Sequence, residues 1–290
     1  MSEIRVNNIT NRDGTAGPSI AGIPVVDSNS HFVVPTGRTG QRYVDGGENI
    51  VRDGLVLHLD AKYSYPSSVG IGTTTSGAAA SPGSSVDGEP YTWYDISGNE
   101  NHGQLVNLVG YNASNGGSLV FDGVNDYGSV TTGIPDTGDF TIGFIYQLTG
   151  TGGRGGLFER KPSLPFNGFS FGQGGSNEWA FTVSGTSDSA NRIQMSFQYP
   201  TINTWYFDVG VYSNGNTVTG YRNGYIVDSS TGTSQGDLSS QGTRTNFLIA
   251  NRDNVTSLPC KVAQVSIYNR ALTASEIQQN FNATRSRYGI

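Results

Sequence analysis

Hydrophobic and polar residues alternate over short stretches along most of this chain. Leucine occupies every second position between residues 55 and 60, and a period of two is typical of a β-strand. Further short apolar runs bounded by Gly, Asn and Asp predict more strands. These are 118–122, 140–148, 166–171, 179–183, 193–199, 205–212, 217–228, 246–250 and 261–269. Many short strands without long helical periods predict an all-β protein.

Polar stretches between these runs have the composition of tight turns. Trp93–Gly103 and Ser118–Tyr127 each set an apolar run against Asp, Asn and Gly, which allow sharp reversals and positive φ. Asn223-Gly224, flanked by aromatic residues, predicts a two-residue hairpin, and Asn214-Gly215 predicts a second. Specialised turns among short apolar runs are typical of a β-sandwich.

One helix is predicted near the C-terminus. Thr273 and Glu276 have the spacing of a capping box, in which each residue satisfies the other's backbone N–H. Ile277 and Phe281 form an apolar stripe four residues apart. We expect this helix to close one edge of the sandwich.

The first 50 residues differ from the rest. Proline and glycine interrupt their short apolar pieces, so residues 1–50 carry too little continuous apolar surface to enclose a core. We expect an extended anchoring arm, followed by one domain over 51–290 with a Gly/Ser/Thr-rich surface loop at 67–90. Apolar anchors on an arm suit strand addition or groove filling on a partner. The anchors are Ile20, Ile23, Val25, Phe32 and Val34. The alternative is a strand that pads the body's own sandwich.

Composition narrows the function classes. The 17 basic and 23 acidic residues give a net charge of −6, which disfavours nucleic-acid binding. No run reaches the roughly 18 apolar residues of a membrane span, so we expect no membrane insertion. The N-terminus lacks the apolar core of a secretory signal. The single cysteine, Cys260, allows no intrachain disulfide, which fits assembly in a reducing cytoplasm.

Two segments match the letters of catalytic or cofactor-binding motifs but lack the structural context that such motifs need. Gly168-Phe169-Ser170-Phe171-Gly172 spells a nucleophile elbow, but its residues alternate as on a strand and no helix start follows. Gly150–Gly155 spells a dinucleotide fingerprint without a βαβ unit, and we interpret it as a loop. Glycoside hydrolysis needs two carboxylates, whereas Glu178 beside Trp179 stands alone. We therefore expect no enzymatic activity.

Several segments, in this order, resemble the laminin-G-like or concanavalin A-like β-sandwich. They are Gly54–Ala61, Trp93–Gly103, Leu119–Tyr127, Phe140–Phe144, Trp205–Val209, Thr217–Val227 and Val262–Thr273. The resemblance implies a two-sheet jelly-roll sandwich. The versions Gly-Leu-Val-Leu-His-Leu-Asp-Ala and Asp-Gly-Val-Asn-Asp-Tyr are similar to virion structural proteins of tailed bacteriophages, and Val33–Arg42 resembles a segment of phage fibre proteins.

The phage resemblance implies a virion location, other virion proteins as partners, and a homo-oligomer. On this basis we expect a surface-displayed structural component, as a capsid decoration or a tail or neck appendage. The alternative is a receptor- or glycan-binding module of a tail fibre that binds a host-surface glycan. Exposed aromatic rings suit sugar stacking, and Trp179, Tyr221 and Tyr225 are the candidate platform. Equally, such rings fill sandwich cores.

One turn carries the oxygen ligands that calcium accepts. Asp122, Asn125 and Asp126 lie within five residues, and the resembling family commonly holds calcium near such loops. In that family an acid on the closing strand assists, and Gln264 stands at this position here. The alternative is that the carboxylates only hydrogen-bond their own turn. The histidines His31, His58 and His102 show no metal-ligand spacing.

Overall fold

The computed structural model of all 290 residues has two compact units, residues 1–48 and residues 49–290. The structure describes residues 19–20, 23–24, 49–64, 91–107, 109–131, 137–151, 156–160, 168–173, 178–185, 192–233, 235, 238, 246–252 and 256–290. In the first unit, β1 (Ser19–Ile20) and β2 (Ile23–Pro24) form an antiparallel pair. The predicted anchors Val25, Phe32 and Val34 and the predicted 67–90 loop lie outside the described residues.

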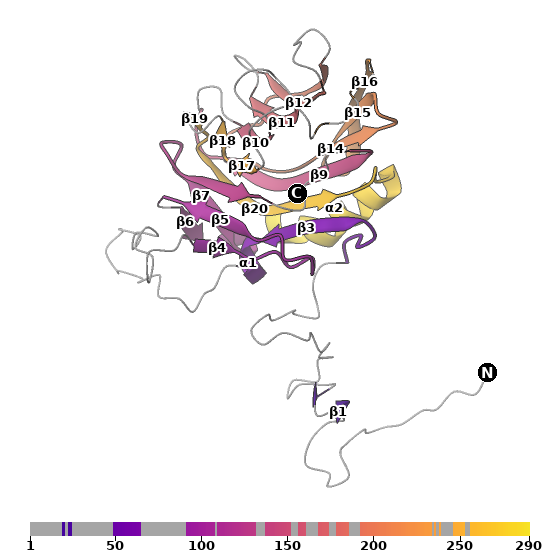
Figure 1. Ribbon diagram of the computed structural model, residues 1–290. Helices are drawn as coiled ribbons and strands as arrows, with labels where there is room; N and C mark the ends of the chain where they lie inside the picture. Colours follow the sequence, from indigo (N-terminus) through magenta and orange to yellow (C-terminus); the bar gives the residue numbers. More distant parts are fainter. Residues whose placement is uncertain are drawn as a thin grey trace, which may run out of the picture. The chain divides into compact units, whose positions relative to one another are not determined.

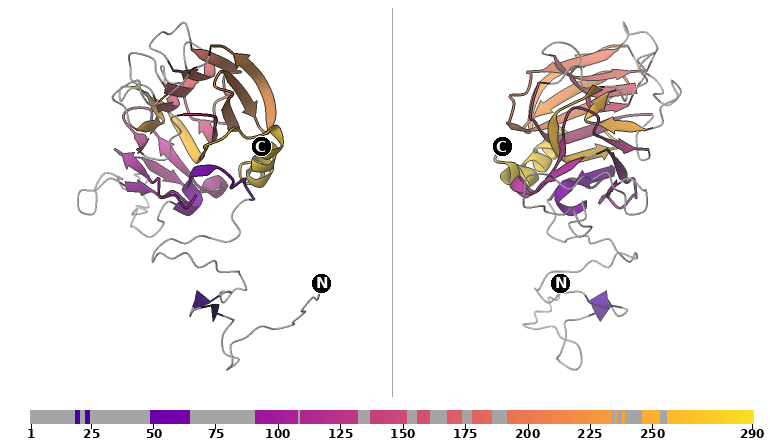
Figure 2. Two further views of the ribbon diagram at one scale, coloured as in Figure 1. Left: turned by 45° about the vertical axis from the view of Figure 1, so that its right-hand side comes forward. Right: turned by 90° about the vertical axis from the view of Figure 1, so that its left-hand side faces the viewer.

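Two antiparallel sheets form the body of the second unit, as the jelly-roll prediction requires (Figures 1 and 2). Sheet I has the order β16-β15-β14-β9-β20-β7-β6, with β3 also paired to β20. Its strands are β3 (Leu55–Asp60), β6 (Gly110–Asn112), β7 (Ser118–Phe121), β9 (Phe140–Leu148), β14 (Trp205–Ser213), β15 (Thr217–Arg222), β16 (Tyr225–Thr231) and β20 (Cys260–Tyr268).

Sheet II has the order β13-β12-β11-β10-β17-β8-β5-β4. Its strands are β4 (Tyr91–Trp93), β5 (Gly103–Val106), β8 (Tyr127–Val130), β10 (Gly156–Arg160), β11 (Gly168–Gln173), β12 (Trp179–Ser184), β13 (Ile193–Phe197) and β17 (Phe247–Ile249). Short elements complete the body: α1 (Ala61–Ser64), η2 (Ser114–Gly116), β18 (Asn251–Arg252) and β19 (Thr256–Ser257).

Aromatic side chains fill the space between the sheets. Phe144 of sheet I lies 5.3 Å from Phe158 and 5.5 Å from Phe171 of sheet II, measured between ring centroids. Tilted and offset rings at such distances gain energy beyond the area that they bury. The single cysteine, Cys260, is buried in this core, and burial raises the pKa of its thiol.

The predicted capping box of the C-terminal helix is confirmed. In α2 (Ala274–Tyr288), Thr273 Oγ1 accepts from the Glu276 N–H and Glu276 Oε2 accepts from the Thr273 N–H. Gly289 ends the helix with φ of 69°, a left-handed conformation that glycine adopts without steric cost.

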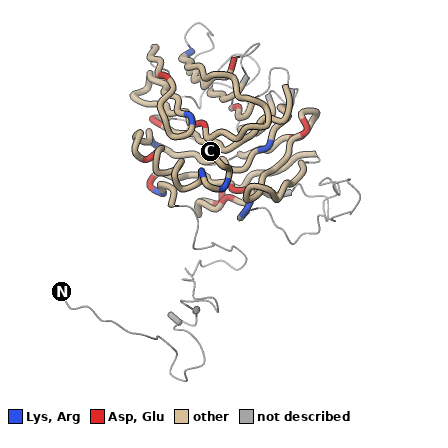
Figure 3. Tube along the Cα trace, turned by 180° about the vertical axis from the view of Figure 1, so that it is seen from behind, with Lys and Arg blue, Asp and Glu red and all other residues tan. Residues whose placement is uncertain are grey.

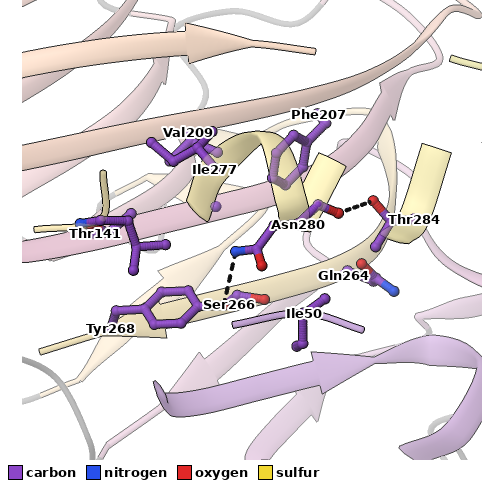
Figure 4. Close-up of a pocket in the computed structure, with 12 residues that line it drawn as sticks. Ile50, Thr141, Phe207, Val209, Gln264, Ser266, Tyr268, Ile277, Asn280 and Thr284 are labelled. Atoms are coloured by element: carbon purple, nitrogen blue, oxygen red, sulfur yellow. Dashed lines mark hydrogen bonds between the residues drawn. The ribbon is translucent and has the colours of Figure 1, made fainter. Parts of the chain in front are cut away.

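The predicted position of α2 at a sandwich edge is wrong, because the helix covers the outer face of sheet I. Ile277 and Phe281 belong to a second apolar cluster with Phe207 and Val209, which point away from the main core (Figure 4). The Phe207 and Phe281 rings lie 6.1 Å apart. Both faces of β9 are therefore covered, and all nine of its residues are buried.

The Asn223-Gly224 hairpin is confirmed. The turn joins β15 to β16, with Arg222 opposite Tyr225 and φ values of 51° and 82° at the two turn residues. Positive φ at both positions is what a type I′ turn requires. This turn splits the predicted 217–228 strand in two and places β16 at the outer edge of sheet I.

Candidate binding surfaces

Two of the three predicted sugar-platform residues are buried. Trp179 is 0% exposed and stacks on Tyr146 with the ring centroids 5.4 Å apart. Tyr221 is 8% exposed and belongs to the apolar cluster beneath α2. Neither ring can offer a face to a ligand in this conformation, so the platform prediction is wrong for both. Tyr225, in contrast, is 68% exposed.

The acidic turn hydrogen-bonds its own backbone. Asp122 Oδ1 accepts from the Val124 N–H at 2.7 Å, and Asp126 Oδ2 accepts from the Asp122 N–H at 3.2 Å. Asp126 is buried, while Asn125 is exposed. Within the described ranges, no three His, Cys, Asp or Glu side chains group closely enough to hold a metal ion. Calcium binding at Asp122, Asn125 and Asp126 stays a prediction.

The Trp93–Gly103 stretch holds strand β3 through the buried carboxylate of Asp95. Its Oδ1 accepts from the backbone N–H groups of His58 and Ser97, both at 2.9 Å. Its Oδ2 accepts from the Ser97 hydroxyl at 2.8 Å and the Asn101 N–H at 3.0 Å. The amide of Asn99 adds a bond to the Leu55 carbonyl. This polar turn therefore satisfies backbone groups of β3, a structural task.

The described histidines are engaged with neighbours. His58 is buried and its Nδ1 lies 2.8 Å from the Ser266 hydroxyl. Burial lowers the pKa of His58, against the opposing effect of nearby Asp60 and Asp95. His102 Nδ1 accepts from the Asp95 N–H at 3.0 Å. His31 lies outside the described residues.

A buried ion pair lies in sheet I where its strands β14 and β15 meet. Asp208 is 0% exposed, and Arg222 donates to both of its oxygens at 2.8 and 2.7 Å. The Tyr146 hydroxyl donates to Oδ2 at 2.7 Å. Burial alone lowers the pKa of Arg222, but the hydrogen bonds and charge of Asp208 raise it above its ordinary value. The guanidinium also lies 4.5 Å from the Tyr206 ring centroid.

Another buried carboxylate, that of Asp60, ties the C-terminal helix to sheet I. Asp60 Oδ2 accepts from Arg287 of α2 and from Gln264 of β20, both at 2.7 Å. Asp60 Oδ1 also accepts from the Lys62 N–H. Gln264, which stands where the resembling family has an acid, therefore supports this carboxylate.

A small cavity lies between α2 and the outer face of sheet I (Figure 4). Its volume is about 20 Å³, which accommodates about one water molecule and no sugar ring. In Figure 4, Asn280 extends from α2 toward Tyr268, and its Nδ2 donates to the tyrosine hydroxyl at 3.0 Å. This region is packing between helix and sheet and offers no ligand pocket.

The residues singled out for possible catalysis, Ser170 and Glu178, have structural roles in sheet II. Gly168–Gly172 lies within strand β11, where Phe169 and Phe171 are buried in the core and Ser170 points to the opposite face. Glu178 hydrogen-bonds with Gln194. The serine pattern therefore lacks the strand-to-helix turn that a nucleophile elbow needs.

Charges of both signs are interspersed over the described body (Figure 3). Within the described ranges, no helix is long and apolar enough to span a bilayer. Large exposed apolar residues gather on β16, where Tyr225, Ile226 and Val227 are consecutive and exposed by 68, 63 and 42%. The alternation of apolar and polar residues did not predict this exposed surface. The signal in the sequence was a run of three consecutive apolar residues directly after the hairpin turn.

Comparison with known proteins identifies the family. Residues 121–278, more than half of the chain, match the Laminin_G_3 family model, described as the concanavalin A-like lectin/glucanases superfamily. No curated protein sequence matches the chain.

Similar folds occur in solved structures of toxin domains. The binding domain of botulinum neurotoxin DC, solved with rat synaptotagmin II, aligns at 15% identity and a TM-score of 0.56, covering 81% of this chain and 52% of that chain. Botulinum neurotoxin type C, whose structure concerns cell entry dependent on two ganglioside molecules, aligns at 15% identity and a TM-score of 0.57, with coverages of 81% and 52%.

The binding domain of Paraclostridial Mosquitocidal Protein 1 aligns at 17% identity and a TM-score of 0.56, covering 80% of this chain and 52% of that chain. This chain thus spans about half the length of the structures that it matches, and identities this low establish the fold alone. Two facing antiparallel sheets and the family match over 121–278 lead to one conclusion. The chain belongs to the concanavalin A-like lectin/glucanase superfamily.

Proposed function

We propose that this chain is a non-enzymatic structural component of a bacteriophage particle, in which the sandwich is displayed on the surface and residues 1–50 attach it to another virion protein. Support for the displayed sandwich comes from the family match, while the structural neighbours whose titles name binding domains favour the second candidate described below. Support for a virion setting comes from the sequence resemblance of Gly54–Ala61, Asp122–Tyr127 and Val33–Arg42 to phage structural proteins.

Three of the five buried carboxylates in the described residues support the non-enzymatic part of the proposal. Asp60, Asp95 and Asp208 each accept at least three hydrogen bonds. A general acid or nucleophile must be able to exchange protons with substrate or attack it. These three groups are instead committed to holding strands and the C-terminal helix together.

The first residues of the body are firmly held, and this supports the anchoring part of the proposal. Asn280 of α2 accepts from the Val51 N–H at 2.7 Å, and the Tyr268 hydroxyl donates to the Val51 carbonyl at 3.0 Å. Gln279 also donates to the Asn49 carbonyl. Ile50 and Val51 are both 8% exposed. A tether that starts from a buried, hydrogen-bonded segment transmits a pull on the arm into α2 and sheet I.

Deleting residues 1–45 tests the anchoring proposal. We expect the truncated protein to keep its sandwich, because the buried segment Ile50–Val51 and its partners remain, but to be lost from assembled particles. Circular dichroism checks the fold, and mass spectrometry of purified particles measures incorporation. A full-length variant with Val25→Asp and Phe32→Asp is the matched test of the apolar anchors. Normal incorporation of the truncated protein would contradict the proposal.

A receptor- or glycan-binding module of a tail fibre is the second candidate, favoured by the exposed ring of Tyr225. On a glycan array we then expect binding that Tyr225→Ala weakens about fivefold, since loss of one ring contact costs roughly 1 kcal/mol. Tyr94→Ala is the control, because that ring is 39% exposed elsewhere.

Chelation with EDTA tests whether calcium contributes through Asp122, Asn125 and Asp126, with Asp126→Ala as a second probe. If neither Tyr225→Ala nor Tyr94→Ala changes the binding, the surface around Tyr225 is not the glycan site.

A further inference from the structure

The strongest unassigned feature is the outer edge of β16. This strand is seven residues long and ends sheet I, so one side of its backbone has no hydrogen-bonded partner strand in the described body, although β13 of sheet II lies close to it. Natural edge strands are commonly shielded by lysine, proline or charge on the strand. Tyr225-Ile226-Val227 carries none of these, and the first charge on β16 is Asp228.

The orientation of these side chains indicates what kind of partner fits. Tyr225 lies opposite Arg222, whose side chain reaches the core-side carboxylate of Asp208, whereas Ile226 lies opposite Tyr221 on the α2 side. The exposed apolar residues therefore project from both faces of the sheet. A flat protein surface would cover only one face. A strand added in the plane of the sheet covers both with its own alternating side chains.

Asp228 removes one backbone donor from this edge. Its Oδ1 accepts from the backbone N–H of Ser229 at 2.8 Å, so a carboxylate occupies the donor that a new strand would use. A bulge between Gly220 and Tyr221 leaves Val227 as the extra residue of β16 just before this point. A partner with a cationic side chain here would pair with Asp228, whereas an acidic partner would be repelled.

The size of the edge disfavours pairing of two β16 strands alone. Seven residues span about 23 Å and a sheet is about 10 Å thick, so the edge presents on the order of 230 Å². Stable interfaces bury roughly 800 Å² per partner. Each chain also carries a net charge of −6, which opposes close contact between bodies. A segment on a long tether can cover this edge without bringing the two negatively charged bodies into contact.

We propose that the β16 edge accepts residues 3–9 of a neighbouring copy as an added strand, with Arg5 facing Asp228. Residues 1–13 contain neither Gly nor Pro, and Ile4 and Val6 flank Arg5 with strand periodicity. The other long Gly- and Pro-free stretch before the body, 25–34, carries an acid and no Lys or Arg. About 40 residues separate residue 9 from the body, a reach of up to about 130 Å when extended.

Sedimentation velocity of the full-length protein over a range of concentrations tests this proposal. We expect reversible self-association that Arg5→Glu and Asp228→Arg each weaken about tenfold. The double variant, which exchanges the charges, should restore it to within about threefold. Ile226→Asp should also weaken association. Val124→Asp, which changes a valine that is 71% exposed on a different turn, is the matched control and should leave association unchanged.

Hydrogen exchange gives the residue-level readout. The amides of Ile226 and Val227 should gain protection as concentration rises, and Arg5→Glu should remove that gain. A monomer at every concentration overturns the proposal. Association that Ile226→Asp abolishes but deletion of residues 1–13 leaves intact overturns the assigned occupant and indicates pairing between β16 edges. Particle incorporation is not the readout, so the result is independent of the proposed anchoring function.

Discussion

Replacing Arg222 with alanine is expected to lower the free energy of unfolding by about 3–5 kcal/mol. The reason is that Asp208 is 0% exposed and would lose two charge-assisted hydrogen bonds while keeping only the Tyr146 hydroxyl. Removing one partner of a buried ion pair leaves an uncompensated buried charge, which is more costly than removing both. Urea unfolding followed by tryptophan fluorescence measures the change.

Two further variants separate burial of charge from loss of packing. The pair Asp208→Leu and Arg222→Met removes both charges and is expected to cost far less than Arg222→Ala. Arg285→Ala is the surface control, because this exposed arginine lies over Phe281 and should change stability by less than about 1 kcal/mol. If Arg222→Ala costs no more than Arg285→Ala, the buried pair does not hold β14 and β15 as described.

Asp95→Ala is expected to destabilise the protein by about 3 kcal/mol or more. The carboxylate satisfies three backbone N–H groups, those of His58, Ser97 and Asn101, and a buried donor left without a partner costs about 1–3 kcal/mol. The loss should be local at first, with faster hydrogen exchange in β3 and the 93–103 turn. Thermal unfolding and exchange mass spectrometry provide the two measurements.

Asp95→Asn is the matched conservative variant. Its amide oxygen can still accept from His58 and Ser97, but its NH₂ group faces the Asn101 donor, so we expect roughly half the destabilisation. Asp53→Ala is the exposed control, since the Asp53 side chain is 86% exposed and its ion pair with Arg270 contributes about 1 kcal/mol at most. Equal effects of Asp95→Ala and Asp53→Ala would contradict the structural role of this turn.

The fold was largely predictable because its longest strands have unbroken apolar patterns between clear turn residues. The predicted 140–148 strand matches Phe140–Leu148, and Leu55–Asp60 shows the expected period of two. Strands such as Gly103–Val106 and Tyr127–Val130 were missed, because glycine and polar residues occupy half of their positions. Their pairing partners, rather than their own propensities, make them strands.

The position of α2 could not be inferred from its own stripe, because Ile277 and Phe281 show only that one face is apolar. A signal existed in β14, where Trp205, Phe207, Val209 and Val211 form a wholly apolar face. Because the opposite face carries Tyr206 and Tyr212, both sides of the strand require cover. The platform prediction failed for a related reason. The apolar pattern of residues 179–183 places Trp179 on a strand. Only the pairing of β12 with its neighbours determines whether the ring faces the core or the solvent.

The most direct test of the whole account is an electron-microscopy map of the native particle that contains this protein. The account predicts a two-sheet body on the particle surface, with residues 1–50 running into density of a neighbouring molecule. Density in which those residues pack only against their own sandwich, without touching another chain, would contradict it.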